Sequence, residues 1–369
     1  MVRVTKIVLL DRMLLLGPPG IGKTETVKRL AKEEAERMGR IFVDLRQADE
    51  RTIEEIKRNP SRYYVFIRII ASHVMPEDLS FPKKESADGL DYVKFLSPRE
   101  IAIMTLPGIA GVLFIDEITN VQRKDQESMY YSIIQEKEVA WNVRFSPLIK
   151  IVAAGNPPEV SSAANLLSAA LINRMTIIEV DPPTVREWIE YMNNTYGDEW
   201  DRRTGAYLMR YEGDLYRPPA ESSTLENFPT PRSWTQLALD LKKLGNSVDP
   251  EFLEEMIVGR LGKEVGARFA TFIRKQPPEV DEVLRRPEII DEIDIDTRYL
   301  TMMMLAENWR KLLDEGTKLV AYLIDHHEDL AVVLYLLLPT KPTNVRWDFT
   351  KRFARLLDRL YPKIKEYIS

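Results

Sequence analysis

The stretch GPPGIGKT, residues 17–24, combines residue types that together can hold a chain of phosphates. Its glycines allow backbone N–H groups to turn toward an anion, and a helix beginning there would point its positive dipole end at the same anion. Lys23 adds a positive charge for the β- and γ-phosphates, and the Thr24 hydroxyl is a ligand for Mg²⁺. The spacing fits the whole pattern G-x-x-x-x-G-K-S/T, so it predicts nucleotide binding. The predicted nucleotide-binding residues are Gly17, Pro18, Pro19, Gly20, Ile21, Gly22, Lys23, Thr24 and Glu25.

Two adjacent carboxylates follow an apolar run in GVLFIDEI, residues 111–118. Four apolar residues in a row are typical of a buried central strand, and Asp116 would stand at its carboxyl end, where it would hold Mg²⁺ through water. Glu117 can act as the general base that polarises an attacking water. This glutamate indicates hydrolysis, because small-molecule kinases need no such base. Ras-type GTPases would require an N-K-x-D element, which we do not find.

A third polar residue, Asn156, ends the apolar strand-like run in IVAAGNPPE, residues 151–159. The carboxyl ends of parallel strands gather at one edge of a sheet, so Asn156 is expected beside Glu117. Its amide can orient the lytic water or contact the γ-phosphate. The alternative is an asparagine that only shapes a tight turn before two prolines.

The elements that must position these residues alternate between strand and helix patterns. Residues 25–39 have helical spacing, and helical patterns lie between several strand candidates. This alternation predicts an α/β fold, a three-layer αβα sandwich on a mainly parallel sheet. The strand candidates are residues 13–16, 41–45, 63–69, 112–115, 149–154 and 176–180.

Three domains are expected. The α/β nucleotide-binding domain covers residues 1–181, because the alternation stops at the DPP of residues 181–183. An all-helical lid domain follows at 182–275, and a helical C-terminal extension covers 276–369. Within the first domain, Asp88-Gly89 is a favoured hairpin turn and predicts an inserted hairpin at about 80–95, with a long loop as the alternative.

Composition excludes several classes of function. The formal net charge of −5 provides no overall attraction to nucleic acid or to an anionic membrane. The chain has no cysteine and three histidines, which excludes disulfides and thiolate metal sites and disfavours a zinc site. No apolar run is long enough to span a membrane. The apolar N-terminus is broken by charges and is interpreted as strand, so a cytoplasmic location is predicted.

The ordered set of motifs resembles the AAA+ ATPases, and more narrowly their MoxR-like group, whose helix 2 carries an insertion. The resemblance rests on GPPGIGKT, LFIDEI, AAGNPPE, SAALINRM and TPRSW, and it covers about residues 13–275. It implies that Asn156 is sensor 1. Arg174 matches the arginine finger that enters a neighbouring subunit's site, and Arg232 matches sensor 2, a lid arginine that touches the γ-phosphate.

The resemblance also implies partners and cofactors. ATP and Mg²⁺ are the expected cofactors, and a finger supplied in trans implies a homo-oligomeric ring, expected to be a hexamer. The client would be a protein or complex that is remodelled or loaded, and a separate von Willebrand-type protein is a suspected partner. A second short hairpin is expected at 138–145. Two departures stand out. Few residues precede Met13, where the family usually has a segment that cradles adenine, so the preference for ATP or GTP stays open. Asn120 replaces the arginine of the group's usual DEINR.

Two other functions use the same residues. One is a nucleic-acid motor or helicase loader, for which Lys83, Lys84 and Tyr92 in the hairpin are suitable, although Glu85 and Asp91 dilute the charge. Nucleic acid is therefore possible but not favoured. The other is a nucleotide-gated scaffold without turnover, which would not need the complete hydrolytic set of Glu117, Asn156 and Arg174. The sequence favours the remodelling ATPase and does not identify its client.

Overall fold

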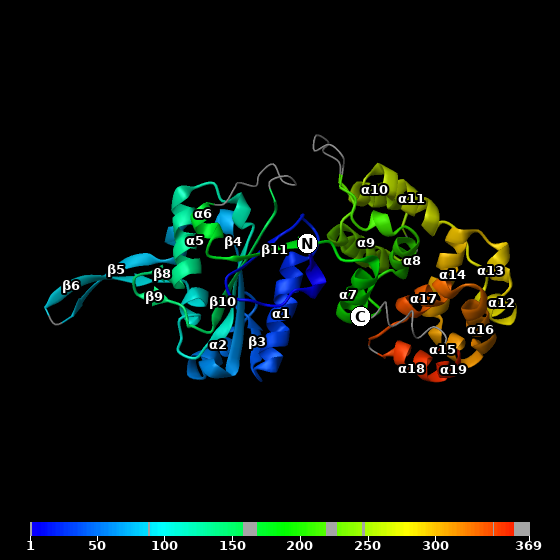
Figure 1. Ribbon diagram of the computed structural model, residues 1–369, viewed down its shortest axis with the longest axis horizontal. Coiled ribbons are helices and arrows are strands. Elements are labelled where there is room, and N and C mark those ends of the chain that lie inside the picture. Colours follow the sequence, from blue (N-terminus) through cyan, green and yellow to red (C-terminus); the bar gives the residue numbers. More distant parts are fainter. Residues whose placement is uncertain are drawn as a thin grey trace. The chain divides into compact units, whose positions relative to one another are not determined.

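We analysed a computed structural model, which describes residues 2–87, 89–157, 168–218, 227–245, 248–341 and 343–357. The chain divides into two compact units, Met1–Pro182 and Pro183–Ser369. The first unit is built on a parallel sheet and the second is helical (Figure 1).

The first unit contains a seven-stranded sheet in the order β1-β11-β2-β10-β7-β4-β3, and every pair of neighbours is parallel. The predicted α/β sandwich is therefore confirmed, and the six predicted strands are present with ends within two residues of those expected. The apolar N-terminus, interpreted from the sequence as strand, contains the two-residue strand β1. The strands are β1 (Val2–Arg3), β2 (Met13–Leu16), β3 (Ile41–Asp44), β4 (Tyr63–Ile70), β7 (Ala110–Asp116), β10 (Ile149–Gly155) and β11 (Thr176–Asp181).

Helices cover both faces of this sheet. Helix α1 (Lys23–Arg37) packs against β3, β4, β7 and β10 on one face. The other face carries a core that includes buried residues of α2 (Glu50–Arg58), α4 (Arg99–Ile103) and α5 (Lys124–Glu136). The central strand β7 is buried along its whole length, as its apolar run predicts for a strand covered on both faces. Two single-turn helices, α3 (Pro76–Leu79) and α6 (Ala169–Ile172), complete the unit.

Two antiparallel hairpins interrupt the α/β order. Strands β5 (Phe81–Ala87) and β6 (Leu90–Leu96) form the longer one, which projects away from the sheet (Figure 1). Asp88 of the predicted turn lies outside the described residues, and Gly89 has a positive φ of 79°. Strands β8 (Glu138–Ala140) and β9 (Val143–Arg144) form the shorter hairpin.

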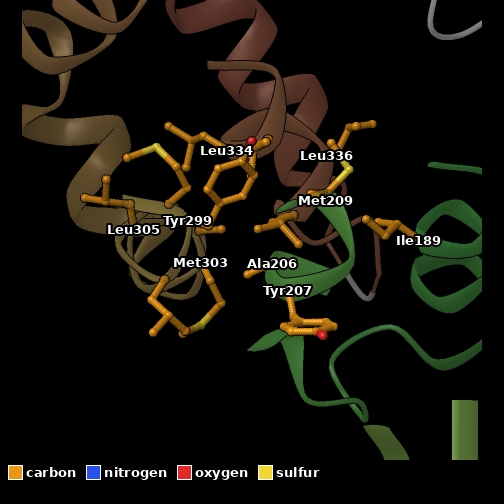
Figure 2. Packing of buried hydrophobic residues seen from close by; sticks show 14 of the residues in the cluster. Ile189, Ala206, Tyr207, Met209, Tyr299, Met303, Leu305, Leu334 and Leu336 are labelled. Carbon is orange, nitrogen blue, oxygen red and sulfur yellow. The ribbon is translucent and has the colours of Figure 1, made fainter. Parts of the chain in front are cut away.

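The second unit contains only helices among its described residues. Its core is rich in aromatic rings: Tyr207 packs edge-on against Phe269 and Phe272, and Trp188 against Trp200. Figure 2 shows Tyr207, Tyr299 and Leu334 of this core, which come from three different helices. The helices are α7 (Val185–Tyr196), α8 (Arg202–Arg210), α9 (Pro231–Leu244), α10 (Pro250–Leu261), α11 (Lys263–Ile273), α12 (Val280–Arg285), α13 (Ile289–Glu292), α14 (Ile295–Glu307), α15 (Trp309–Glu315), α16 (Thr317–His326), α17 (Glu328–Leu337), α18 (Val345–Arg352) and α19 (Ala354–Leu357).

One hydrophobic cluster runs through this unit from Val185 to Leu357. Residues on both sides of position 275 therefore share a core within one compact unit, and the division into a lid domain (182–275) and a C-terminal extension (276–369) stays a prediction. In the part of the chain that the structure describes, no helix has the length and apolar character needed to cross a bilayer.

Candidate functional site

The phosphate-binding pattern forms the turn between β2 and α1. Gly20 and Gly22 have φ values of 77° and 94°, a backbone region that residues with a Cβ rarely adopt. Helix α1 begins directly afterwards at Lys23. A Cβ on Gly17 would lie 2.5 Å from the carbonyl oxygen of Val180, so this glycine permits close packing of β11. The turn therefore leaves backbone N–H groups at a helix N-terminus, where an anion is stabilised.

Lys23 is buried and its ammonium group points back along the turn. Its Nζ donates to the carbonyl oxygens of Gly17 at 2.6 Å and Pro18 at 2.9 Å, and to Oδ1 of Asn156 at 2.9 Å. These acceptors hold the ammonium group beside the first residues of the turn and Asn156. They also show that Asn156 and Lys23, which are 133 residues apart, meet at the same edge of the sheet.

Asp116 ends β7 beside the start of α1. Its Oδ2 accepts a hydrogen bond from the Thr24 hydroxyl at 2.9 Å. The same oxygen accepts a hydrogen bond from Arg68 Nε of β4 at 2.9 Å and forms an ion pair with Arg68 Nη2 at 2.8 Å. Asp116 is only 6% exposed, so its charge is compensated mainly by these neighbours rather than by water.

Thr24 and Asp116 fit the Mg²⁺ that the sequence predicts. A hydroxyl and a carboxylate are hard oxygen ligands, and their oxygens lie 2.9 Å apart on two adjoining elements. A cation, the Arg68 guanidinium, already lies against this carboxylate. Among the described residues there is no group of three or more histidine and acidic side chains able to hold a metal.

Glu117 adopts a left-handed conformation, with φ 58° and ψ 34°, which non-glycine residues rarely adopt. The turn is stabilised by its backbone N–H, which donates to Asp116 Oδ1 at 3.0 Å. The side chain is held as well, because Asn120 Nδ2 donates to Glu117 Oε2 at 3.2 Å. Asn120 closes the short 3-10 helix Ile118–Asn120, so the residue in place of the arginine of DEINR contacts the predicted base.

Asn156 follows β10 and is fixed through its backbone by Thr119. The Asn156 N–H donates to Thr119 Oγ1 at 3.0 Å. This approach requires Gly155, because a Cβ there would come within 2.5 Å of Thr119 Cγ2 and 2.9 Å of its hydroxyl. The Asn156 side chain is thereby free to meet Lys23.

The two predicted arginines lie on other elements of the chain. Arg174 follows α6 at the joint with β11, and its guanidinium lies over the ring of Tyr131 in α5, 4.4 Å from the centroid. Arg232 is exposed on the first turn of α9 in the helical unit. Their predicted roles therefore stay predictions.

Sequence reasoning missed four residues around the site, Arg68, Thr119, Tyr131 and Gly155, and it noted Asn120 without assigning it a contact. Arg68 left a signal, since it is the one charged residue in the otherwise apolar and aromatic run YYVFIRII of β4. The others left none, because a threonine or a glycine at the end of a strand usually belongs to a turn, and a tyrosine in a helix is usually a packing residue.

Comparison with known proteins agrees with this geometry. Residues 13–180 match the family model AAA, the ATPase family associated with various cellular activities. No curated protein sequence matches the chain.

Three solved structures are similar at low identity. NtrX from Brucella abortus, in complex with ATP, is 13% identical over 98% of this chain and 65% of its own, with a TM-score of 0.35. Hsp104, with ATPγS and FITC casein, is 17% identical over 75% of this chain and 42% of its own, with a TM-score of 0.32. Cdc6p from Pyrobaculum aerophilum is 13% identical over 94% of this chain and 80% of its own, with a TM-score of 0.32. The chain thus spans less than two thirds of NtrX and Hsp104. Residues 13–180, matched by the family model and carrying the site described above, are an AAA ATPase domain.

Proposed function

We propose that this protein is a MoxR-like AAA+ ATPase that hydrolyses ATP with Mg²⁺ in a ring and uses the energy to remodel or load a partner protein. The observation that carries the proposal is the meeting of Lys23, Thr24, Asp116 and Asn156 at one edge of the sheet, with Glu117 directly after Asp116. Each of these residues has a distinct task in phosphoryl transfer to water.

The turn and Lys23 would hold the β- and γ-phosphates, and Thr24 and Asp116 would hold Mg²⁺. The ion, when bound, supplies positive charge to the phosphate oxygens. Glu117 would accept a proton from water, and its carboxylate is already positioned by its own left-handed backbone and by Asn120. Asn156, hydrogen-bonded to Lys23, would contact the γ-phosphate or orient the water.

Phosphate release by the purified full-length chain tests this function. We expect ATP turnover that requires Mg²⁺. Turnover should be abolished in Lys23→Ala, because the β- and γ-phosphates lose the positive charge of the lysine that would bind them. Lys32→Ala is the matched control: Lys32 lies on the same helix but contacts the ring of Phe42. Parallel assays with GTP decide the nucleotide preference. No Mg²⁺-dependent release with either nucleotide would contradict the proposal.

The proposed ring follows from Arg174. Within its own chain this residue lies over Tyr131 at the joint between α6 and β11, whereas Lys23 and Asp116 are hydrogen-bonded to other partners. A guanidinium that completes a neighbour's site would produce a head-to-tail contact, and such contacts close into rings. We propose a homohexamer, with Arg232 acting on the γ-phosphate of its own subunit.

The two hairpins favour a protein partner over nucleic acid. Asn142 links them, because its side-chain amide donates to Phe95 O and accepts from Phe95 N, both at 2.9 Å. Beside it, Trp141 is 94% exposed. In the long hairpin, Lys84 pairs with Asp91, and Lys83 and Lys94 both lie near Glu85.

These ion pairs leave little free positive charge for phosphates, while Leu90, Val93 and Trp141 expose apolar surface. An exposed, unfolded or loosely folded polypeptide matches this chemistry. A von Willebrand-type protein remains a candidate partner on the same surface.

Trp141→Ser tests the hairpin surface. We expect it to weaken binding of fluorescein-labelled casein, an unfolded protein, at least about threefold, because tryptophan is a frequent binding hot spot. ATP turnover without casein should not change, since the hairpins carry none of the predicted site residues. Trp347→Ser is the matched control, because Trp347 is 58% exposed in the helical unit. Binding is read by fluorescence anisotropy with ATP in a Glu117→Gln background, a substitution of the predicted base that is expected to slow hydrolysis.

A single-stranded DNA oligonucleotide serves as the competing probe. The nucleic-acid motor would be favoured instead if DNA bound more tightly than casein, with affinity falling steeply as salt is raised. An unchanged casein affinity in Trp141→Ser would exclude the turn between β8 and β9 as the docking point.

A further inference from the structure

We propose that Arg68 is a built-in counter-cation that competes with the divalent metal for Asp116, so that the site takes up metal together with nucleotide rather than alone. This inference rests on the proposed nucleotide site and adds a residue that regulates its metal affinity. It explains why a charged residue is placed within an otherwise apolar strand.

The strand register brings Arg68 to this position. In the β4–β7 pair, Arg68 lies opposite Phe114, and Ile70 lies opposite Asp116. Side chains alternate along a strand, so Phe114 and Asp116 are on one face, together with Phe66 and Arg68. The rings of Phe66 and Phe114 stack at 6.4 Å on this face. Arg68 is thus the next side chain beyond this aromatic pair and is the diagonal neighbour of Asp116.

The contacts of Asp116 show what Arg68 does there. Its Oδ2 receives Arg68 Nε at 2.9 Å and Arg68 Nη2 at 2.8 Å, in addition to the Thr24 hydroxyl at 2.9 Å. Three donors therefore converge on the one oxygen that faces Thr24. A metal held by Thr24 and Asp116, directly or through water, needs lone pairs on these oxygens, so metal and guanidinium would compete for Oδ2.

Burial makes the counter-charge necessary. The Asp116 side chain is 9% exposed, and an isolated buried carboxylate would be strongly destabilising. Arg68 is permanently charged and cannot release Asp116 by losing a proton. Its side chain is 38% exposed, so it can release Asp116 by rotating toward solvent. Asp44, the carboxylate at the end of the neighbouring strand β3, has a counter-charge of its own, because it forms an ion pair with Lys28 at 2.7 Å.

The consequence is an ordered uptake. Without nucleotide, a metal must displace Arg68 and gains few protein ligands in return. With nucleotide, the phosphate oxygens supply further metal ligands and also offer the displaced guanidinium an anion. Arg68 would thus keep the empty site neutral and prevent metal from binding alone.

The test is Mn²⁺ binding to the full-length, nucleotide-free protein, followed by electron paramagnetic resonance of free Mn²⁺. Arg68→Met keeps the apolar stem and removes the charge. We expect its Kd for Mn²⁺ to be at least about tenfold lower than that of the wild type, because a positive charge next to the ligand is gone. Arg68→Gln should show the same gain, and Arg68→Lys, which keeps the charge, should stay near the wild type.

The double variant Arg68→Met/Asp116→Asn must lose the gain, which locates it at Asp116. An unchanged Kd in both neutral variants, or a gain that survives in the double variant, would overturn the proposal. Circular dichroism identifies a variant that fails to fold, and the second neutral variant then decides. Because the readout needs no ATP, a failure here is distinct from a failure of the proposed hydrolysis, which phosphate release measures.

Discussion

Glu117→Gln is expected to bind ATP and Mg²⁺ like the wild type but to hydrolyse ATP about 10²–10⁴ times more slowly, the usual contribution of a general base. Glutamine has the same shape as glutamate and can keep the hydrogen bond to Asn120, but it cannot accept a proton from water. Lys23 and Thr24, the predicted ligands of phosphate and Mg²⁺, are hydrogen-bonded to Asn156 and Asp116, and this substitution leaves those contacts in place. Nucleotide affinity and turnover should therefore change independently.

Single-turnover phosphate release and binding of a fluorescent ATP analogue measure the two quantities. Glu136→Gln is the matched control, because Glu136 is exposed at the end of α5 and has no predicted role. A turnover within a factor of two of the wild type would refute Glu117 as the base. The slow variant also stabilises the ATP-bound state, so a pull-down with it and ATP is the most direct way to identify the partner.

Arg174→Ala is expected to bind nucleotide normally and to lose most of its activity. An arginine supplied to the transition state of phosphoryl transfer is worth about 10³–10⁵ in rate, because its fork neutralises charge on the γ-phosphoryl oxygens. In the single chain, Arg174 lies over the Tyr131 ring, so we expect this loss without a change in the contacts of Lys23. Arg51→Ala is the control, since the Arg51 side chain is 87% exposed on α2.

Mixing two inactive variants distinguishes action in trans from action in cis. Lys23→Ala subunits lack a phosphate-binding lysine but keep Arg174, so they can complete the sites of Arg174→Ala subunits. Partial recovery of ATP turnover is expected in the mixture. No recovery at any ratio, or light scattering that shows only monomers with a slowly hydrolysed ATP analogue, would contradict the ring.

The sequence by itself determined that the first unit has a parallel sheet and at which strand ends the predicted site residues lie. Phosphate chemistry requires certain residue types at fixed spacing, so GPPGIGKT predicts its turn and helix without reference to the rest of the chain. The run before Asp116 predicts a buried strand for a similar local reason, since only a strand covered on both faces is apolar throughout. The order of the strands in the parallel sheet was not readable, because pairing depends on the crossovers between strands.

Tertiary structure alone decided which residues surround these positions. Arg68 reaches Asp116 only because β4 pairs with β7 in one register, and a shift by one residue would turn it to the opposite face. Thr119 fixes Asn156 only because Gly155 has no side chain. Asn142 joins two hairpins that are separate in the sequence. Each is a contact between segments distant along the chain. Such contacts depend on packing and register, for which no local pattern of residues codes.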